Sequence, residues 1–359
     1  MAKRVVIAMS GGVDSSTAAY LLKEAGYEVV GITMDLLPSS CKIEKADSCC
    51  SLQTFPDAQD IADQLKIEYY LLDYKEEFER EVVRYFVNEY LNGQTPNPCV
   101  VCNAKVKFGL LLDKAKQLGA DYLATGHYAR VLKKDGRYVI EKGKDLTKDQ
   151  SYFLYRLSQH QLKHLLMPLG EHKKEEVRKI AYSRGLKVYN KPESQEICFI
   201  PDNHYQEFIK KRLDKDQEPG LILDKSNKIL GRHPGVAFFT IGQRKGLGIA
   251  TGKPLYVLSI DSKKNVLVVG EEALLYRREL IAQEVNWIAM EKLTAEMEVM
   301  AKIRFLHKEA EAIITPILDG KVRIKFKEPQ RAIACGQSVV FYQEGVITGG
   351  GVIGKEDTS

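Results

Sequence analysis

The stretch AMSGGVDSS, residues 8–16, has the residue types of an anion-binding loop. Gly11 and Gly12 allow backbone N–H groups to approach an anion closely, and the following serines add hydroxyl groups at the start of a helix-like run. Phosphate is the natural ligand, because the first turn of a helix carries partial positive charge. The string has neither the lysine of a GxxxxGK[ST] loop nor the GxGxxG dinucleotide spacing. It indicates phosphate chemistry of another kind, with a plain helix-capping turn as the alternative.

Three cysteines form the second candidate group. Cys99 and Cys102 end the proline-punctuated stretch NGQTPNPCVVCN (92–103), and Cys198 lies in SQEICFIPD (194–202). Such thiols can act as nucleophiles, form half of a structural zinc site, or be simple buried side chains. The other cysteines of the 7 are Cys41, Cys49, Cys50 and Cys335. An odd number, in a chain that opens directly on a strand pattern rather than a secretion signal, favours thiol, metal or redox roles over a disulfide framework.

The elements that must position these residues alternate between strand and helix in the first part of the chain. Residues 4–8 and 27–34 have the pattern of buried strands, with a helix between them that stops at Gly26. The same order repeats in 57–74 and 107–129, and another helix is expected over about 76–91. This predicts a doubly wound parallel α/β sheet through about residue 130. Functional residues should gather at its carboxyl edge, where Ser10, Met34 and Gly126 fall.

The second half of the chain is rich in glycine, proline and short alternating runs. We expect three domains, over 1–202, 203–276 and 277–359, the second small and β-rich and the third a small closed β-barrel with a hairpin turn at Glu344–Gly345. In KVRIKFK (321–327) one face is apolar and the other wholly cationic. That face is a solvated surface or a phosphate contact, and the loop IGQRKGLG (241–248) favours RNA.

Composition sets limits on the class of protein. Of 359 residues, 44% are hydrophobic and 28% charged, and no window approaches about 18 uninterrupted apolar residues, so no membrane span is expected. We expect a cytoplasmic protein. The formal net charge of +5 is a weak indication of a polyanionic partner.

Several ordered strings together resemble one family. They are SGGVDSS, TPNPCVVCNAKVKF, ATGHYAR, KDQSYFLY, ICFI, TIGQRKGLGI and GQSVVFY. Nearly end to end, the chain resembles the tRNA-specific 2-thiouridylases of the ATP pyrophosphatase superfamily. The resemblance implies a PP-loop core and an enzyme that uses ATP and Mg²⁺ to replace the C2 oxygen of uridine at the wobble position (U34) of tRNA with sulfur. It also implies lysine, glutamate and glutamine tRNAs as substrates, and a cysteine desulfurase or sulfur-carrier protein as sulfur donor.

The resemblance carries residue roles with it. ATP would be bound by Ala8, Met9, Ser10, Gly11, Gly12, Val13, Asp14, Ser15, Met34 and Gly126. Transfer RNA would be contacted by Asn97, Pro98 and Cys99 beside the target base, by His127, Lys148, Asp149 and Gln150 from the core, and by Arg304, Phe305 and Gln337 from the C-terminal module. Asp14 would help to hold Mg²⁺.

The cysteines would then carry the sulfur. Cys198 would bear a persulfide that attacks C2 after adenylation of its oxygen, and Cys102 would resolve the product and leave a Cys102–Cys198 disulfide. The wobble base would be turned out of its stack. Many members of the family have aspartate where this chain has Cys99, so a [4Fe–4S] cluster on Cys99, Cys102 and Cys198 is an alternative route. Two rival functions remain: an ATP-dependent amide or amidine synthetase for a small metabolite, and a zinc-structured RNA-binding protein.

Overall fold

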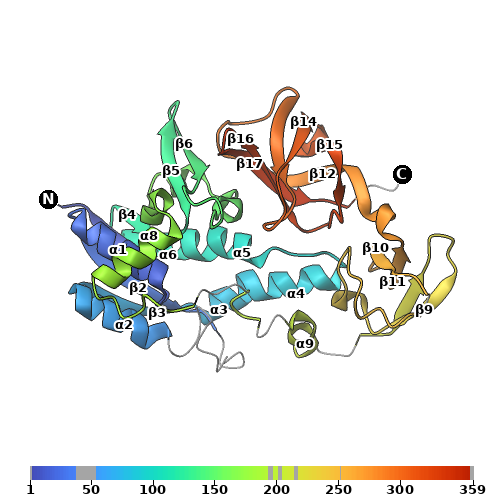
Figure 1. Cartoon of the computed structure of the whole chain (residues 1–359), viewed down its shortest axis with the longest axis horizontal. Helices are drawn as coiled ribbons and strands as arrows, with labels where there is room; N and C mark the ends of the chain where they lie inside the picture. The colour runs from blue at the N-terminus through green and yellow to red at the C-terminus, as the bar shows by residue number, and fades with distance from the viewer. Residues whose placement is uncertain are drawn as a thin grey trace. The chain divides into compact units, whose positions relative to one another are not determined.

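The computed structural model describes residues 2–37, 54–192, 197–200, 204–213, 217–250 and 252–355. Cys41, Cys49 and Cys50 lie outside the described residues. The chain divides into two compact units (Figure 1). The first contains Met1–Val83, Cys99–Asn203 and Glu344–Thr348, and the second contains Arg84–Pro98, His204–Gln343 and Gly349–Ser359. In these described parts, no helix is long and apolar enough to cross a membrane.

A five-stranded parallel sheet is the centre of the first unit. Its strands lie in the order β3-β2-β1-β4-β7, namely Glu68–Asp73, Glu28–Asp35, Arg4–Ala8, Tyr122–Ala124 and Leu165–Leu166. The central strand β1 pairs in parallel with both β2 and β4, and its residues Val5, Val6 and Ile7 are fully buried. A strand buried on both faces reads as a continuous apolar run, which is why RVVIA could be recognised from its sequence. The expected parallel α/β core is confirmed.

Three helices share a hydrophobic core with this sheet. They are α1 (Val13–Glu24), α2 (Thr54–Leu65) and α8 (Lys174–Ser183). Ala18 and Leu22 of α1, Ile61 of α2, and Val177 and Ala181 of α8 all belong to this core. Because α1 begins at Val13, the second half of the glycine-rich loop forms the first turn of the helix. The expected stop at Gly26 is confirmed by its positive φ of 83°.

The segment between β3 and β4 is helical but not uniformly α-helical. The expected helix over 76–91 consists of α3 (Lys75–Phe78), the π-helix η2 (Glu79–Val83) and α4 (Arg84–Leu91). After a break come α5 (Pro98–Val101), the π-helix η3 (Cys102–Leu110) and α6 (Leu111–Gln117). Wide π-turns are rare and frequently occur at functional sites. Here one of them starts at Cys102.

The rest of the first unit is made of short elements. A hairpin of β5 (Ala129–Lys134) and β6 (Arg137–Lys142) follows β4, and Val346 pairs with Glu141 of this hairpin. The short helices that follow are η4 (Ser151–Leu154), α7 (Gln159–Leu162) and η5 (Pro168–Glu171). The sequence of residues 148–158 is typical of a helix, but in the structure it contains only the short 3-10 turn η4.

The second unit opens with a small four-stranded sheet after α9 (Tyr205–Lys210). Its strands lie in the order β10-β11-β8-β9, namely Tyr256–Asp261, Val266–Gly270, Gly220–Leu223 and Ile229–His233. Two short 3-10 turns, η7 (Val236–Phe238) and η8 (Glu272–Leu275), flank it. Ile222, Val257 and Leu267 are fully buried in its core. The expected β-rich region is confirmed.

A closed antiparallel barrel completes the second unit. Its strands are β12 (Tyr276–Trp287), β13 (Met297–Lys302), β14 (Ala310–Pro316), β15 (Val322–Arg331), β16 (Ser338–Gln343) and β17 (Val346–Ile353), with the turn η9 (Leu318–Gly320) before β15. They lie in the order β12-β15-β14-β13-β16-β17, and pairing of β12 with β17 closes the barrel. Glu344 and Gly345 both have positive φ, as a two-residue hairpin turn requires. The expected barrel is confirmed.

The cationic face of β15 is less cationic than its sequence indicates. Val322, Ile324 and Phe326 are buried in the barrel, as the alternation predicts. On the outer face, Lys327 forms an ion pair of 2.8 Å with Glu311, and Lys325 lies 4.0 Å from Glu279. The neighbouring strands β12 and β14 supply these carboxylates, so the description of the face as wholly cationic is wrong.

Candidate active site

The glycine-rich loop connects β1 to α1 in a tight turn. Gly11 has a φ of 61°, which only a residue without a Cβ adopts at little cost. The hydroxyl of Ser15 accepts a hydrogen bond from the backbone N–H of Ser10 (3.1 Å), and the Ser16 hydroxyl donates to the carbonyl of Gly12 (2.9 Å). The loop is thus held by its own serines. The amides of the first helical turn have no partner within the helix, which makes this a site for an anion.

A cavity of ≈ 220 Å³ opens beside this loop, at the carboxyl ends of β1, β2 and β4. It is lined by Ala8, Met9, Ser10, Asp14, Ser15, Ile32, Thr33, Met34, Leu36, Lys107, Thr125, Gly126, His127 and Gln150. All of the expected ATP-binding residues except Gly11, Gly12 and Val13 are in this lining, and those three form the turn itself. The structure therefore brings the loop, Met34 and Gly126 together at one cavity, as expected.

One wall of the cavity comes from β2 and the residue that follows it. Ile32, Met34 and Leu36 are apolar, and the hydroxyl of Thr33 is turned back to donate to the carbonyl of Met9 (2.8 Å). An apolar wall with few polar groups suits a flat purine ring.

Gly126 lies directly against the backbone of the glycine-rich loop. A Cβ placed on it would lie 2.9 Å from the backbone carbon of Asp14 and 2.9 Å from the backbone nitrogen of Ser15. No real Cβ approaches a backbone so closely, so a larger residue would displace the loop. Gly126 acts here through its missing side chain.

His127 and Gln150, which the sequence assigned to tRNA, lie on the wall of the same cavity. The Nδ1 atom of His127 is 2.7 Å from the hydroxyl of Thr125, and its ring packs against Phe108 at 5.7 Å. Burial lowers the pKa of His127 to about 3, and the positive charge of Lys107 adds to the lowering. His127 is therefore neutral at physiological pH. The side-chain oxygen of Gln150 accepts from the backbone of Tyr128 (3.0 Å).

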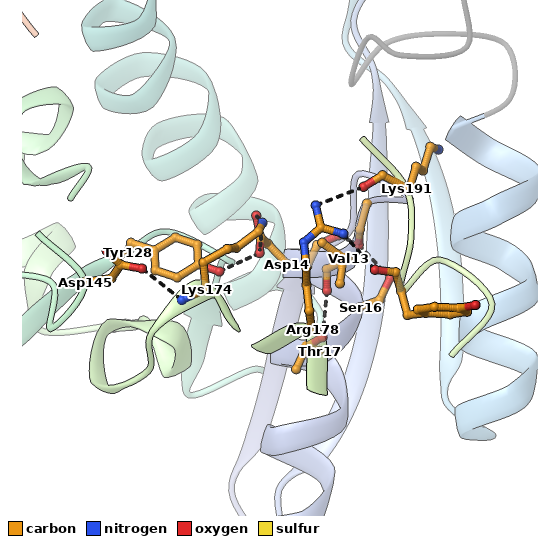
Figure 2. A network of polar contacts seen from close by, with 12 residues as sticks. Val13, Asp14, Ser16, Thr17, Tyr128, Asp145, Lys174, Arg178 and Lys191 are labelled. Atoms are coloured by element: carbon orange, nitrogen blue, oxygen red, sulfur yellow. Dashed lines mark hydrogen bonds and ion pairs between the residues drawn. The ribbon is translucent and has the colours of Figure 1, made fainter. Parts of the chain in front are cut away.

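Asp14 is held in a network of polar contacts (Figure 2). Lys174 of α8 donates to both carboxylate oxygens, at 2.7 and 2.8 Å, and the hydroxyl of Tyr128 donates to one of them at 2.7 Å. The backbone N–H of Lys174 is itself held by Asp145 (2.9 Å). The side chain of Asp14 thus anchors the loop to α8.

In this structure Asp14 is an anchor of the loop, because the ammonium of Lys174 contacts both of its carboxylate oxygens. Within the described ranges, no group of three or more His, Cys, Asp or Glu side chains is placed to hold a metal ion. The role of Asp14 in Mg²⁺ binding stays a prediction.

A second lysine reaches the loop from the segment after α8. The ammonium of Lys191 donates to the carbonyl of Gly11 (3.2 Å) and to the carboxylate of Asp57 in α2 (2.6 Å). Arg178 holds this segment in turn, by donating to the carbonyls of Tyr189 (2.8 Å) and Lys191 (3.4 Å) (Figure 2). Two lysines from elsewhere in the unit, Lys174 and Lys191, thus contact the loop.

The three candidate cysteines lie on different short elements. Cys99 is partly exposed in α5, Cys102 is 7% exposed at the start of η3, and Cys198 is partly exposed beside Phe199. The ring of Phe199 packs on Phe78 at 5.6 Å, which holds the Cys198 segment to the first unit. None of the three is paired in a disulfide with another described cysteine. Among the described residues no group of three or more such side chains is placed to hold a metal ion, and the [4Fe–4S] alternative stays a prediction.

Two of the other expected tRNA contacts follow β6 in the first unit. The carboxylate of Asp149 is 7% exposed and accepts from the backbone of Gly143 (3.2 Å) and from the N–H and hydroxyl of Ser151 (3.1 and 2.8 Å). Its role in the structure is to stabilise this turn. Lys148 beside it is partly exposed, and its backbone N–H donates to the carbonyl of Asp145 (3.1 Å).

The remaining expected tRNA contacts are in the second unit. The side-chain amide of Gln337 donates to the carbonyls of Thr95 (3.3 Å) and Pro96 (3.0 Å), directly before Asn97 and the start of α5 at Pro98. Gln337 therefore positions the segment expected to border the target base. Arg304 donates to the carbonyl of Arg331, and the ring of Phe305 lies 5.5 Å from the ammonium of Lys302.

The parallel sheet, the glycine-rich loop at its central strand and the cavity beside it define a nucleotide-binding enzyme of the pyrophosphate-loop class. Family models match three consecutive parts of the chain. They are a tRNA methyl transferase HUP domain (residues 3–202), a tRNA methyl transferase PRC-barrel domain (206–271) and an aminomethyltransferase beta-barrel domain (277–353).

Curated relatives specify the family further. The chain is 52% identical over 354 residues to a tRNA-specific 2-thiouridylase, MnmA, of Clostridium acetobutylicum, covering 98% of this chain and 100% of the relative. It is 51% identical over 356 residues to a protein of the same name in Clostridium botulinum strain Loch Maree, covering 99% and 100%. The chain belongs to the family of tRNA-specific 2-thiouridylases. A solved 4-thiouridine synthetase–RNA complex with bound ATP is similar at 16% identity and a TM-score of 0.36, over 58% of this chain and 50% of that one, which is too slight for an inference.

Proposed function

We propose that the protein catalyses ATP-dependent 2-thiolation of the wobble uridine (U34) of tRNA. The observation that carries the proposal is the cavity beside the glycine-rich loop, with an apolar wall for a purine on β2 and the loop amides for the phosphates. Membership of the family, at 52% identity over nearly the whole chain, supplies the substrate class. Lysine, glutamate and glutamine tRNAs and a cytoplasmic location are part of this proposal.

The first step activates the base. The O2 atom of uridine attacks the α-phosphorus of ATP, the bond from that phosphorus to the pyrophosphate oxygen breaks, and the N3 proton leaves to solvent. Pyrophosphate departs on the loop, where the amides of Gly11–Ser15 and the positive helix end stabilise its charge. The product is a base with AMP attached at O2, which turns a poor leaving group into a good one.

The second step transfers sulfur. The terminal sulfur of a persulfide on Cys198 attacks C2, loses its proton, and displaces AMP with the C2–O bond electrons. The thiolate of Cys102 then attacks the Cys198 sulfur, so that the 2-thiouridine sulfur leaves with the S–S electron pair and N3 regains a proton. Two thiols have been oxidised to a disulfide, which a dithiol reductant must reduce before a persulfide donor reloads Cys198.

Cys99 has no step in this scheme. It is partly exposed beside Cys102, and the described residues do not bring three thiols to one metal site. We therefore favour the persulfide route over the [4Fe–4S] alternative. We favour neither of the two rival functions, zinc-structured RNA binding and small-molecule synthetase activity.

A reconstituted thiolation assay tests the proposal. It contains purified protein, unmodified tRNA transcript, ATP labelled at the α-phosphate and a persulfide donor. We expect AMP release and 2-thiouridine by nucleoside mass spectrometry. Cys198→Ala should still release pyrophosphate and form adenylated tRNA, without thiolation, and Cys102→Ala should accumulate a tRNA adduct that dithiothreitol releases. Cys335→Ala is the matched control, since Cys335 lies in the second unit, where its thiol donates to the carbonyl of Gly354 (3.2 Å).

Absence of both pyrophosphate and adenylated tRNA or AMP with the wild-type protein and cognate tRNA contradicts the adenylation step. If anaerobically prepared protein contains iron and sulfide, and Cys99→Ala loses activity together with both, the cluster route replaces the persulfide route. If Cys99→Ala keeps most of its activity while Cys102→Ala and Cys198→Ala do not, the cluster route fails.

A further inference from the structure

Two peptide groups of the glycine-rich loop are fixed through their carbonyl oxygens. The carbonyl of Gly12 accepts from the backbone N–H of Ser16 (3.2 Å) and from the Ser16 hydroxyl (2.9 Å), both in α1. The carbonyl of Gly11 accepts from outside the loop, from the ammonium of Lys191 (3.2 Å), 180 residues further along the chain. One carbonyl is therefore held by the helix itself and the other by a distant lysine.

The peptide group between Gly11 and Gly12 depends most on such a contact. Gly11 has a φ of 61°, and Gly12 is extended, with φ −100° and ψ 166°. A peptide group flanked by two glycines meets few steric restrictions, so it can turn over at little cost. No peptide bond among the described residues is cis, and in a trans peptide the N–H points away from the carbonyl before it. The contact of Lys191 with the Gly11 carbonyl therefore directs the N–H of Gly12 away from Lys191.

Lys191 is itself held by groups outside the loop. Its ammonium donates to the carboxylate of Asp57 on α2 (2.6 Å), and the two side chains are 20% and 24% exposed. Its backbone N–H donates to the carbonyl of Val188 (3.0 Å), which belongs to the core, and Arg178 donates to its own carbonyl (Figure 2). An ammonium with a carboxylate this close attracts a further anion only weakly, because the two charges largely cancel at a distance. The contacts of Lys191 thus suit holding a carbonyl better than attracting a phosphate.

We propose that Lys191 is a positioning residue of the glycine-rich loop, which holds the Gly11 carbonyl so that the N–H of Gly12 donates to bound pyrophosphate. This inference rests on the proposed function in one respect, since that function supplies pyrophosphate as the anion. Consecutive backbone N–H groups that face the same side form an anion-binding concavity, and a carbonyl turned to that side would repel the anion. Lys191 therefore acts on the loop, and the backbone makes the contact with the phosphates.

Equilibrium binding of inorganic pyrophosphate to the full chain tests the inference. Lys191→Met should weaken this binding by about 10–100-fold, which corresponds to one hydrogen bond to a charged group. Lys191→Arg, which keeps a cation that can donate to the carbonyl, should recover most of the affinity. Lys187→Met is the matched control, because Lys187 lies on the same segment and pairs with Asp60 of the same helix α2 at 3.6 Å, but its side chain is 80% exposed. The affinity of this control should stay within about twofold of the wild-type value, as for loss of an exposed ion pair.

The amide of Gly12 can be observed selectively by NMR. When glycine alone carries ¹³C at its carbonyl and ¹⁵N at its amide, a spectrum that correlates the two shows only glycines preceded by glycine. In this sequence they are Gly12, Gly350 and Gly351. Gly350 and Gly351 lie in β17 of the second unit and serve as internal references. Saturating pyrophosphate should move the amide proton of Gly12 downfield in the wild-type protein and in Lys187→Met, and much less in Lys191→Met.

Three results would overturn the inference. The first is that Lys191→Met binds pyrophosphate within about threefold of the wild-type affinity. The second is that it binds weakly but shows the full displacement of the Gly12 signal at saturation, since the lysine would then act on the phosphates directly. The third is that hydrogen exchange throughout α8 becomes faster by the same factor as the affinity falls, since a general loosening would then explain the loss.

Asp57→Asn is a second variant, which keeps the inference testable if Lys191→Met does not fold. Without the carboxylate that holds its ammonium, Lys191 should fix the Gly11 carbonyl less well, so pyrophosphate binding should weaken and the Gly12 displacement should shrink. If Lys191 were instead a phosphate ligand, removal of the competing carboxylate would strengthen binding. Stronger binding by Asp57→Asn therefore also overturns the inference.

Failure of this inference can be distinguished from failure of the proposed function. Neither the binding measurement nor the NMR measurement uses tRNA or a persulfide donor. If the protein thiolates tRNA but the Gly12 amide does not respond to pyrophosphate, only the role of Lys191 fails. If the variants behave as expected but the wild-type protein does not thiolate tRNA, the proposed function fails and the role of Lys191 in the loop remains.

Discussion

The ion pair between Asp14 and Lys174 should stabilise the first turn of α1, and a double-mutant cycle measures by how much. The variants are Asp14→Asn, Lys174→Met and the two together. Each single change leaves one charged group without its partner, where Lys174 is 9% exposed and Asp14 32% exposed. Breaking a fully buried pair costs about 3–5 kcal/mol and breaking an exposed pair about 0.2–1 kcal/mol, so an intermediate loss of about 2 kcal/mol is expected. The double variant should recover most of it, because no unpaired charge remains.

The assay must report on the first unit. The only tryptophan of the chain, Trp287, lies in β12 of the second unit, so its fluorescence would follow the barrel. Hydrogen exchange of the amides of α1, followed by mass spectrometry of its peptides, reports locally. A loss of about 2 kcal/mol corresponds to about 30-fold faster exchange in each single variant. The reasoning is refuted if the single variants exchange at the wild-type rate, or if the double variant exchanges as fast as the sum of the two losses predicts.

Two further outcomes can be checked with simpler measurements. Replacing Lys321 and Arg323 by glutamine should reduce the slope of log tRNA affinity against log salt concentration by up to about one unit per lost phosphate contact. Replacing Lys325 and Lys327, which have carboxylate neighbours, should reduce this slope less. Equal slopes for all variants would assign the face to solvent. Burial lowers the pKa of His127 in the folded state to about 3, from an ordinary value of 6.5. Between these two pH values the unfolded chain binds a proton that the folded chain does not. The free energy of unfolding therefore falls as the pH is lowered, by up to about 1.4 kcal/mol per pH unit. Thermal unfolding of His127→Gln from pH 4 to 8 should lack this contribution, and an unchanged pH dependence would contradict it.

The parts of the site that depend on neighbouring residues could be predicted from the sequence. The strand β1, the glycine-rich loop and α1 follow each other within 4–24, and local spacing was enough to identify them. The edge of a parallel sheet then placed Met34 and Gly126 beside the loop without any further information. The division into domains 1–202, 203–276 and 277–359 stays a prediction.

The lysines of the site could not be predicted. Lys174 and Lys191 contact the loop across 160 and 180 residues of sequence, and nothing in their local pattern distinguishes them from other lysines of a helical, charged segment.

Gly126 affects how one decides, from sequence alone, whether a related gene encodes an active enzyme. A Gly126→Ala copy would retain the glycine-rich loop, both cysteines proposed to carry sulfur and the lysine of the cavity. Yet its extra methyl group would lie 2.9 Å from the backbone of the loop and push it away from the sheet. A survey that scores only reactive side chains would count such a gene as active. The position to inspect first is therefore one that contributes no chemical group at all.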